Sequence, residues 1–213
     1  MVMATRYGNH IDKNGLVLYF DAAYPGSAGS SVPDLSGTGN NGTWINGSLW
    51  SSAYGGVFQF NASNVLRSPV NVSSGTSTVI GSSRYTGANT RRIISATNNN
   101  WLLGHWQSSV ENFFSEGWVT AAGAGPNDQS WRIYAGTSDV PNDSYAFYIN
   151  GVLNTGPNVN GAAGVNGLSL GNSGLYGESS NGEVGFVMIY TRILTLVEIQ
   201  TITSFMKGRY GIS

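Results

Sequence analysis

The stretch that decides the fold is residues 145–153, which read YAFYINGVL. Its first five residues alternate in character with the two-residue period of a half-buried β-strand. The dipeptide Asn150-Gly151 interrupts this run, and Val152-Leu153 resumes it. Asn-Gly between two strands favours a type I′ turn, because both central residues then need positive φ. The stretch therefore predicts an antiparallel hairpin with a two-residue turn.

Short apolar runs ended by Gly, Asn, Ser or Pro extend from this hairpin in both directions. They occupy residues 15–21, 57–60, 79–82, 92–95, 101–106, 112–114, 118–120, 130–134, 168–171 and 185–190. Many short strands without a break in composition predict one all-β domain. We expect an antiparallel two-sheet jelly-roll sandwich over residues 16–213, preceded by an N-terminal arm over residues 1–15.

One short helix is expected near the C-terminus. Thr195 can cap it, and Glu198 lies three residues on, which is the spacing of a capping box. The apolar residues Leu196, Ile199, Ile202 and Phe205 recur at three-residue spacing and predict the buried face. Gly208 is expected to end the helix.

The composition excludes several classes of protein. Charged residues make up 10% of the 213 residues, the net charge is -1, and there is no cysteine. Nucleic-acid binding needs a basic face, which scattered Lys and Arg do not supply. The adjacent pair Arg91-Arg92 is interpreted as a solvated strand end. No run approaches the roughly 20 apolar residues of a membrane helix, and the N-terminus lacks the apolar core of a signal peptide.

Four segments resemble a known family in their order and spacing. They are residues 16–23 with 34–37 and 40–43, then 147–153, then 182–194, and finally 195–200. Together they resemble laminin-G-like domains of the concanavalin-A-like lectin/glucanase superfamily. The resemblance implies a jelly roll with one concave and one convex sheet. Fold does not give function, and this superfamily contains lectins, hydrolases and adhesion modules.

The opening of the chain resembles the versions of this domain in bacteriophage virion proteins. In those proteins the domain lies on tail fibres or decorates the capsid. The resemblance implies a non-enzymatic display module on the virion surface, assembled in the cytoplasm without a signal peptide. Its expected partners are capsid or fibre subunits and cell-surface polysaccharide, in an oligomeric or assembly-bound state.

The alternative function is a glycoside hydrolase of the glucanase type that uses Glu111 and Glu116. Glucanases of the superfamily carry a Glu-x-Asp-x-x-Glu strand, and here Phe113 stands where the Asp should be. A retaining pair of carboxyl groups must lie about 5–5.5 Å apart. Residues 111 and 116 face opposite sides of a regular strand unless a bulge intervenes.

Candidate sugar-binding residues combine an aromatic ring with amides, because sugar rings stack on aromatic faces and amides bind hydroxyl groups. They are Asn98, Asn99, Asn100, Trp101, Trp106 and Gln107. Strand alternation places Trp101 and Trp106 on opposite faces, so one of them is expected in the core.

Calcium is the candidate cofactor, with Asp139 and Asp143 as the best local pair of carboxylates. The same residues also suit a turn that needs no metal. The two histidines, His10 and His105, have no ligand partner at a useful spacing, so zinc is not expected. We expect His105 to be hydrogen-bonded and half-buried.

Overall fold

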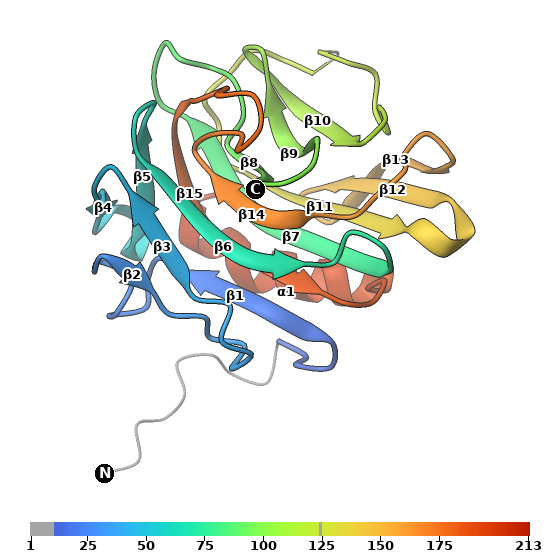
Figure 1. Ribbon diagram of the computed structural model, residues 1–213, viewed down its shortest axis with the longest axis horizontal. Coiled ribbons are helices and arrows are strands. Elements are labelled where there is room, and N and C mark those ends of the chain that lie inside the picture. Colours follow the sequence, from blue (N-terminus) through green and yellow to red (C-terminus); the bar gives the residue numbers. More distant parts are fainter. Residues whose placement is uncertain (1–10, 124) are drawn as a thin grey trace.

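The computed structural model describes residues 11–123 and 125–213, which form two antiparallel sheets packed face to face (Figure 1). Sheet A comprises β1 (Leu16–Asp21), β4 (Trp50–Ser51), β5 (Val57–Asn61), β7 (Thr76–Tyr85), β11 (Arg132–Asp139), β12 (Ser144–Ile149), β13 (Val152–Asn158) and β15 (Asn181–Tyr190). Sheet B comprises β2 (Ser31–Val32), β3 (Gly42–Ile45), β6 (Val65–Asn71), β8 (Ile94–Ala96), β9 (Trp101–Trp106), β10 (Ser109–Ser115) and β14 (Asn166–Leu170). The predicted all-β jelly-roll sandwich is confirmed.

The order of strands in each sheet brings distant segments together. Sheet A runs β13-β12-β11-β7-β15-β5-β4, with β1 also paired to β15. Sheet B runs β10-β9-β8-β14-β6-β3-β2. Two short 3-10 turns, η1 (Ala53–Gly55) and η2 (Val140–Asn142), and one helix, α1 (Leu196–Tyr210), complete the described elements.

The predicted hairpin is present as β12 and β13. Ile149 pairs with Val152, and the turn residues Asn150 and Gly151 have φ values of 52° and 82°. Asn150 also accepts a hydrogen bond from the backbone N–H of Ile133 at 2.9 Å. The turn is therefore tied to the neighbouring strand β11.

Strand β15 explains why the sandwich has two apolar layers. Val187 and Ile189 point into the core between the sheets, whereas Met188 and Tyr190 point into a second core on the outer face of sheet A. The alternation of a strand thus supplies apolar side chains to both layers. Helix α1 covers the outer side of the second layer and lies behind sheet A in Figure 1.

The capping box of α1 is confirmed, but its buried face differs from the prediction. Thr195 and Glu198 exchange both expected hydrogen bonds. Ile199 and Ile202 are buried as expected, but Leu196 and Phe205 are 46% and 38% exposed. The buried positions that continue the face are Met206 and Tyr210, because a helix of 3.6 residues per turn drifts off a strict three-residue spacing.

The end of α1 is also corrected. Gly208 lies inside the helix, and Gly211 forms the C-cap in the left-handed conformation, with φ of 63°. Of the predicted N-terminal arm, residues 1–10 lie outside the described residues, as does His10. Within the described ranges, no helix is long and apolar enough to cross a membrane.

Candidate functional site

The predicted asparagine run forms the turn between β8 and β9, where its amides stabilise the fold. Asn98 contacts the Asn166 side chain at 3.3 Å, and Asn99 donates to the Gly164 carbonyl at 2.9 Å. Asn100 accepts from the Arg92 guanidinium at 2.7 Å. Each amide therefore already has an intramolecular partner, which leaves this turn poorly suited to bind a ligand.

Trp101 is in the core between the sheets, and the expectation that it offers a ring to a sugar is wrong. Its side chain is 1% exposed, and its ring meets Phe113 edge-to-face at 5.7 Å. The alternation along β9 directs it inward, as it does Leu103. An aromatic ring in a strand is more often core than ligand platform, because burying it contributes so much apolar area.

Trp106 and Gln107 lie near solvent at the end of β9. Trp106 is partly buried and meets the ring of Trp118 edge-to-face at 4.9 Å. Gln107 is exposed at the tip of the β9–β10 hairpin. Among the predicted sugar-binding residues, Asn98 and Gln107 are exposed, but only Gln107 has a side-chain amide without a hydrogen-bond partner among the described residues.

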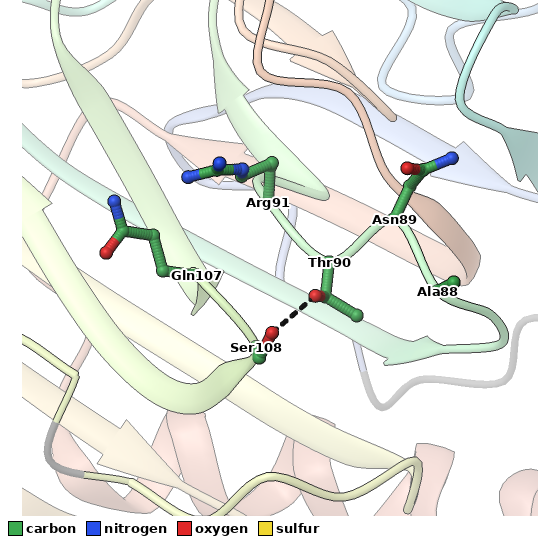
Figure 2. Close-up of a pocket in the computed structure, with 6 residues that line it drawn as sticks. All are labelled: Ala88, Asn89, Thr90, Arg91, Gln107 and Ser108. Carbon is green, nitrogen blue, oxygen red and sulfur yellow. Dashed lines mark hydrogen bonds between the residues drawn. The ribbon is translucent and has the colours of Figure 1, made fainter.

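Gln107 forms part of a pocket that we call the loop pocket. Its volume is about 490 Å³, and it is lined by Ala88, Asn89, Thr90, Arg91, Gln107 and Ser108. Four residues come from the loop that follows β7, and two come from the hairpin tip. The loop pocket is shallow and polar, and Figure 2 shows the Arg91 guanidinium extending from the loop toward the side on which Gln107 lies.

Hydrogen bonds join the two walls of the loop pocket. The hydroxyls of Thr90 and Ser108 are 2.6 Å apart (Figure 2), and the Ser108 N–H donates to the Thr90 carbonyl at 2.8 Å. The loop is fixed to β15 as well, since the N–H of Asn181 donates to the carbonyl of Asn89 at 2.7 Å. The lining is therefore held in place before any ligand arrives.

The hairpin tip has a strained backbone. Gln107 and Ser108 both have positive φ, at 48° and 69°. A left-handed conformation costs a non-glycine residue about 1–2 kcal/mol, and Asn or Gly normally occupies these positions. Such strain is concentrated at functional sites, where the surrounding structure maintains it.

Three side chains of the loop pocket have no hydrogen-bond partner among the described residues. They are the amides of Asn89 and Gln107 and the guanidinium of Arg91. Other described arginines form ion pairs with carboxylates, namely Arg84, Arg92, Arg132, Arg192 and Arg209. The loop pocket thus presents unused amide and guanidinium groups to solvent.

The sequence interpretation missed Arg91 and Asn89. The pair Arg91-Arg92 is predicted to be a solvated strand end, but both residues lie in the loop between β7 and β8, and only Arg91 is exposed. Arg92 is 6% exposed and pairs with Glu178. No sequence pattern distinguishes the two arginines, because their exposure depends on the distant loop that carries Glu178.

The two carboxylates of the alternative hydrolase site have separate partners. A bulge with φ of 67° at Glu111 does interrupt β10, as a paired site would require. However, Glu111 pairs with Arg132 at 2.8 Å, whereas Glu116 accepts from the backbone N–H of Asn100. Each glutamate is thus engaged by a partner of its own, whereas a retaining hydrolase needs its two carboxyl groups about 5–5.5 Å apart.

His105 is fully buried, not half-buried as expected. Its ring lies edge-to-face against Tyr85 at 4.5 Å and Tyr134 at 5.4 Å. Burial, together with the positive charge of Arg132, lowers its pKa to about 3. The imidazole is therefore neutral at pH 7 and belongs to the core.

Asp139 and Asp143 flank the turn η2, and their arrangement fits a turn better than a calcium site. Both carboxylate oxygens of Asp139 accept hydrogen bonds from the Asn142 amide at 3.0 Å. Asp143 caps the turn with a left-handed backbone. No group of three or more His, Cys, Asp or Glu side chains gathers anywhere in the described ranges, whereas calcium prefers six to eight oxygen ligands.

Comparison with known proteins identifies the family to which the chain belongs. A family model described as "Concanavalin A-like lectin/glucanases superfamily" matches residues 68–200, more than half of the chain. No curated protein sequence matches the chain.

Solved structures share the fold at low sequence identity. Domain 4 of an extracellular arabinanase from Geobacillus stearothermophilus, solved with arabinotriose, has a TM-score of 0.67 and 16% identity, over 90% of this chain and 100% of that domain. The binding domain of Paraclostridial Mosquitocidal Protein 1 has a TM-score of 0.66 and 14% identity, over 94% of this chain and 56% of that one.

The binding domain of botulinum neurotoxin DC, in complex with SialylT, has a TM-score of 0.61 and 14% identity, over 91% of this chain and 52% of that one. The chain thus spans about half the length of the two toxin domains. At these identities the likeness concerns the fold alone.

Proposed function

Because the chain belongs to the concanavalin A-like lectin/glucanases superfamily, we propose that it is a non-enzymatic carbohydrate-binding module whose site is the loop pocket. Two of the structural neighbours were solved with the saccharide arabinotriose and with SialylT, which supports a glycan as the ligand class. The fold by itself does not assign the function, so the proposal depends on the site.

The observation that carries the proposal is the set of unused polar groups in the loop pocket. The side-chain amides of Asn89 and Gln107 each offer both a donor and an acceptor, and a sugar hydroxyl needs both. Ligand sites combine a preformed concave surface with a few convergent polar groups. The hydrogen bonds between Thr90 and Ser108 supply the preformed surface.

A non-enzymatic role is favoured over the glycoside hydrolase that would use Glu111 and Glu116. The loop pocket is lined by no carboxylate that could serve as an acid, base or nucleophile. The two glutamates have separate partners, Arg132 and the backbone of Asn100. Incubation with β-glucan should therefore release no reducing sugar, and turnover that Glu111→Gln abolishes would contradict this part of the proposal.

We further propose that the module is displayed in many copies on a bacteriophage virion, as a capsid decoration or tail-fibre component. An open, shallow site gives weak binding to a single sugar, because little of the ligand surface is buried. Display of many copies raises avidity by about 10²–10⁴ without any new contact. Low charge also suits repeated display, since it limits non-specific electrostatic binding.

A glycan array tests the carbohydrate-binding proposal. The wild-type protein should bind a subset of glycans, and the double variant Asn89→Ala/Gln107→Ala should lose that binding. The matched control is Asn127→Ala/Gln129→Ala, which removes the same two amide types from exposed positions outside the loop pocket. An array that stays blank at high protein concentration, or equal loss in both double variants, would contradict the proposal.

Proteomics of purified particles tests the virion proposal. The chain should co-purify with phage particles through a density gradient, in a fixed ratio to the major capsid protein. Its absence from particles of a culture that expresses it would refute this location and leave the glycan-binding proposal standing.

A further inference from the structure

We propose that the loop pocket selects a carboxylate-bearing sugar, with the Arg91 guanidinium binding the carboxylate and the amides of Asn89 and Gln107 binding hydroxyl groups. This inference deepens the proposed function and depends on it. Two observations support it: the lining of the loop pocket contains one unpaired positive charge, and hydrogen bonds anchor the backbone of Arg91.

Arg91 is the charged side chain among the lining residues. The adjacent arginine, Arg92, is neutralised by Glu178 and lies under the ring of Tyr176 at 5.2 Å. A ligand in the loop pocket therefore meets one unpaired positive charge, and no lining carboxylate repels an anion. An unpaired guanidinium beside neutral amides favours an acidic sugar over a neutral one.

The position of Arg91 is fixed from its backbone outward. Its N–H donates to the buried Ser180 hydroxyl at 2.8 Å, and its carbonyl accepts from the buried Tyr85 hydroxyl at 2.6 Å. Its side chain nevertheless extends into solvent (Figure 2). This arrangement anchors the backbone of Arg91 without using the donors of its guanidinium, so all of those donors remain available to a ligand.

The chemistry of the lining favours a single carboxylate over a polyanion. The planar fork of a guanidinium matches the two oxygens of a carboxylate. Binding of sulfated or phosphorylated polymers depends on clusters of Lys and Arg, and the loop pocket contains one arginine in a chain of net charge -1. Uronic acids and sialic acids are the sugars that carry such a carboxylate.

The test compares acidic glycans with their carboxyl-reduced counterparts on one array, with sulfated glycans as a separate arm. The probes are oligogalacturonides, glucuronic-acid-terminated glycans and sialyllactose. Wild-type protein should bind the acidic member of each pair roughly tenfold more tightly, which is the effect of one charge-assisted hydrogen-bonded contact. Raising the salt concentration should weaken the acidic member selectively.

Two variants test whether Arg91 causes the preference for acidic glycans. Arg91→Gln keeps a long polar side chain but removes the charge, so it should abolish the preference while leaving weak binding to the neutral members. Lys207→Gln removes a partly exposed charge on the last turn of α1, away from the loop pocket, and should change nothing. Circular dichroism confirms that both variants fold.

Three outcomes would overturn the inference alone, and a fourth would overturn it together with the proposed function. Equal binding of acidic and neutral members by wild-type protein would overturn the inference alone, as would a preference that survives in Arg91→Gln. Stronger binding to the sulfated arm than to the carboxylated arm would also overturn it. An array on which no glycan binds would overturn the proposed function and the inference together.

Discussion

Gln107 and Ser108 form a two-residue hairpin turn with side chains that such turns rarely carry. Gln107→Gly should therefore raise the free energy of unfolding by about 1 kcal/mol, because glycine adopts the left-handed conformation without the steric strain that a side chain causes. The same change removes an amide from the loop pocket, so glycan affinity should fall. Urea denaturation and glycan binding measured on the same preparation check the two opposite effects.

The control for this substitution is Asp143→Gly. Asp143 is an exposed residue with φ of 49° at the β11–β12 turn, which lies at the opposite end of β7 from the loop pocket. It should gain similar stability and keep its glycan affinity. If Gln107→Gly gained stability without losing affinity, the amide of Gln107 would have no part in binding.

Single residues also mark the limits of sequence interpretation. Alternation along β9 predicted that either Trp101 or Trp106 is in the core, and the structure identifies Trp101. The Asn98–Asn100 run is predicted to bind a ligand, yet its partners are Asn166 and Gly164, more than 60 residues away, and Arg92 in the preceding loop. Local composition cannot distinguish an amide that is hydrogen-bonded within the fold from one that is available to a ligand, because the difference depends on tertiary contacts.

At the scale of elements, strands and turns with strong local signals were predicted correctly. The hairpin of β12 and β13 follows from Asn150-Gly151, and the start of α1 follows from Thr195 and Glu198. The buried face of α1 was only half predicted, since Met206 and Tyr210 replace Phe205 in it. The bulge at Glu111 has no glycine to announce it, so its position could not be predicted.

A substitution in the capping box of α1 should affect the stability of the fold and leave glycan affinity unchanged. Thr195→Ala removes the hydroxyl that accepts from the Glu198 N–H at 3.3 Å and should cost about 1 kcal/mol of stability. Glycan affinity at a temperature where the variant is folded should not change, because α1 contributes nothing to the lining of the loop pocket. Chemical denaturation and array binding measure the two quantities, and a loss of affinity in folded protein would contradict the separation.

For the whole molecule, stability should fall in two stages as the pH is lowered. Burial lowers the pKa of His105 to about 3, so the unfolded chain takes up a proton near pH 6.5 before the native state does. The hydrogen bonds of Arg192 and Arg132 lower the pKa values of Glu198 and Asp128 to about 2. Because these carboxylate pKa values are lower in the native state, the unfolded state again binds protons first. The stability therefore falls a second time from about pH 4.5 downward.

Urea denaturation at pH 7, 5.5 and 4 measures this dependence. His105→Phe keeps an aromatic ring between Tyr85 and Tyr134. In this variant the free energy of unfolding should no longer fall between pH 7 and 5, but it should still fall below about pH 4.5. A wild-type stability that is constant from pH 7 to 5 would contradict the assignment of a buried neutral imidazole.

Calcium should affect neither stability nor binding. A calcium ion at 100 times its dissociation constant would stabilise the native state by about 2.7 kcal/mol, which a thermal melt detects easily. Both oxygens of the Asp139 carboxylate are instead engaged by Asn142. Melting temperatures in EDTA and in millimolar calcium should coincide, and an increase with calcium would show that these residues bind it.

An NMR titration shows whether the loop pocket binds glycans. Oligogalacturonide or sialyllactose is added to ¹⁵N-labelled protein, and the backbone and side-chain amide signals are followed. We expect the shifts to concentrate on residues 88–91 and 107–108, including the side-chain amides of Asn89 and Gln107. Shifts that concentrate elsewhere, for example around Trp118 or the turn η2, or no shifts with any glycan that binds on the array, would contradict it.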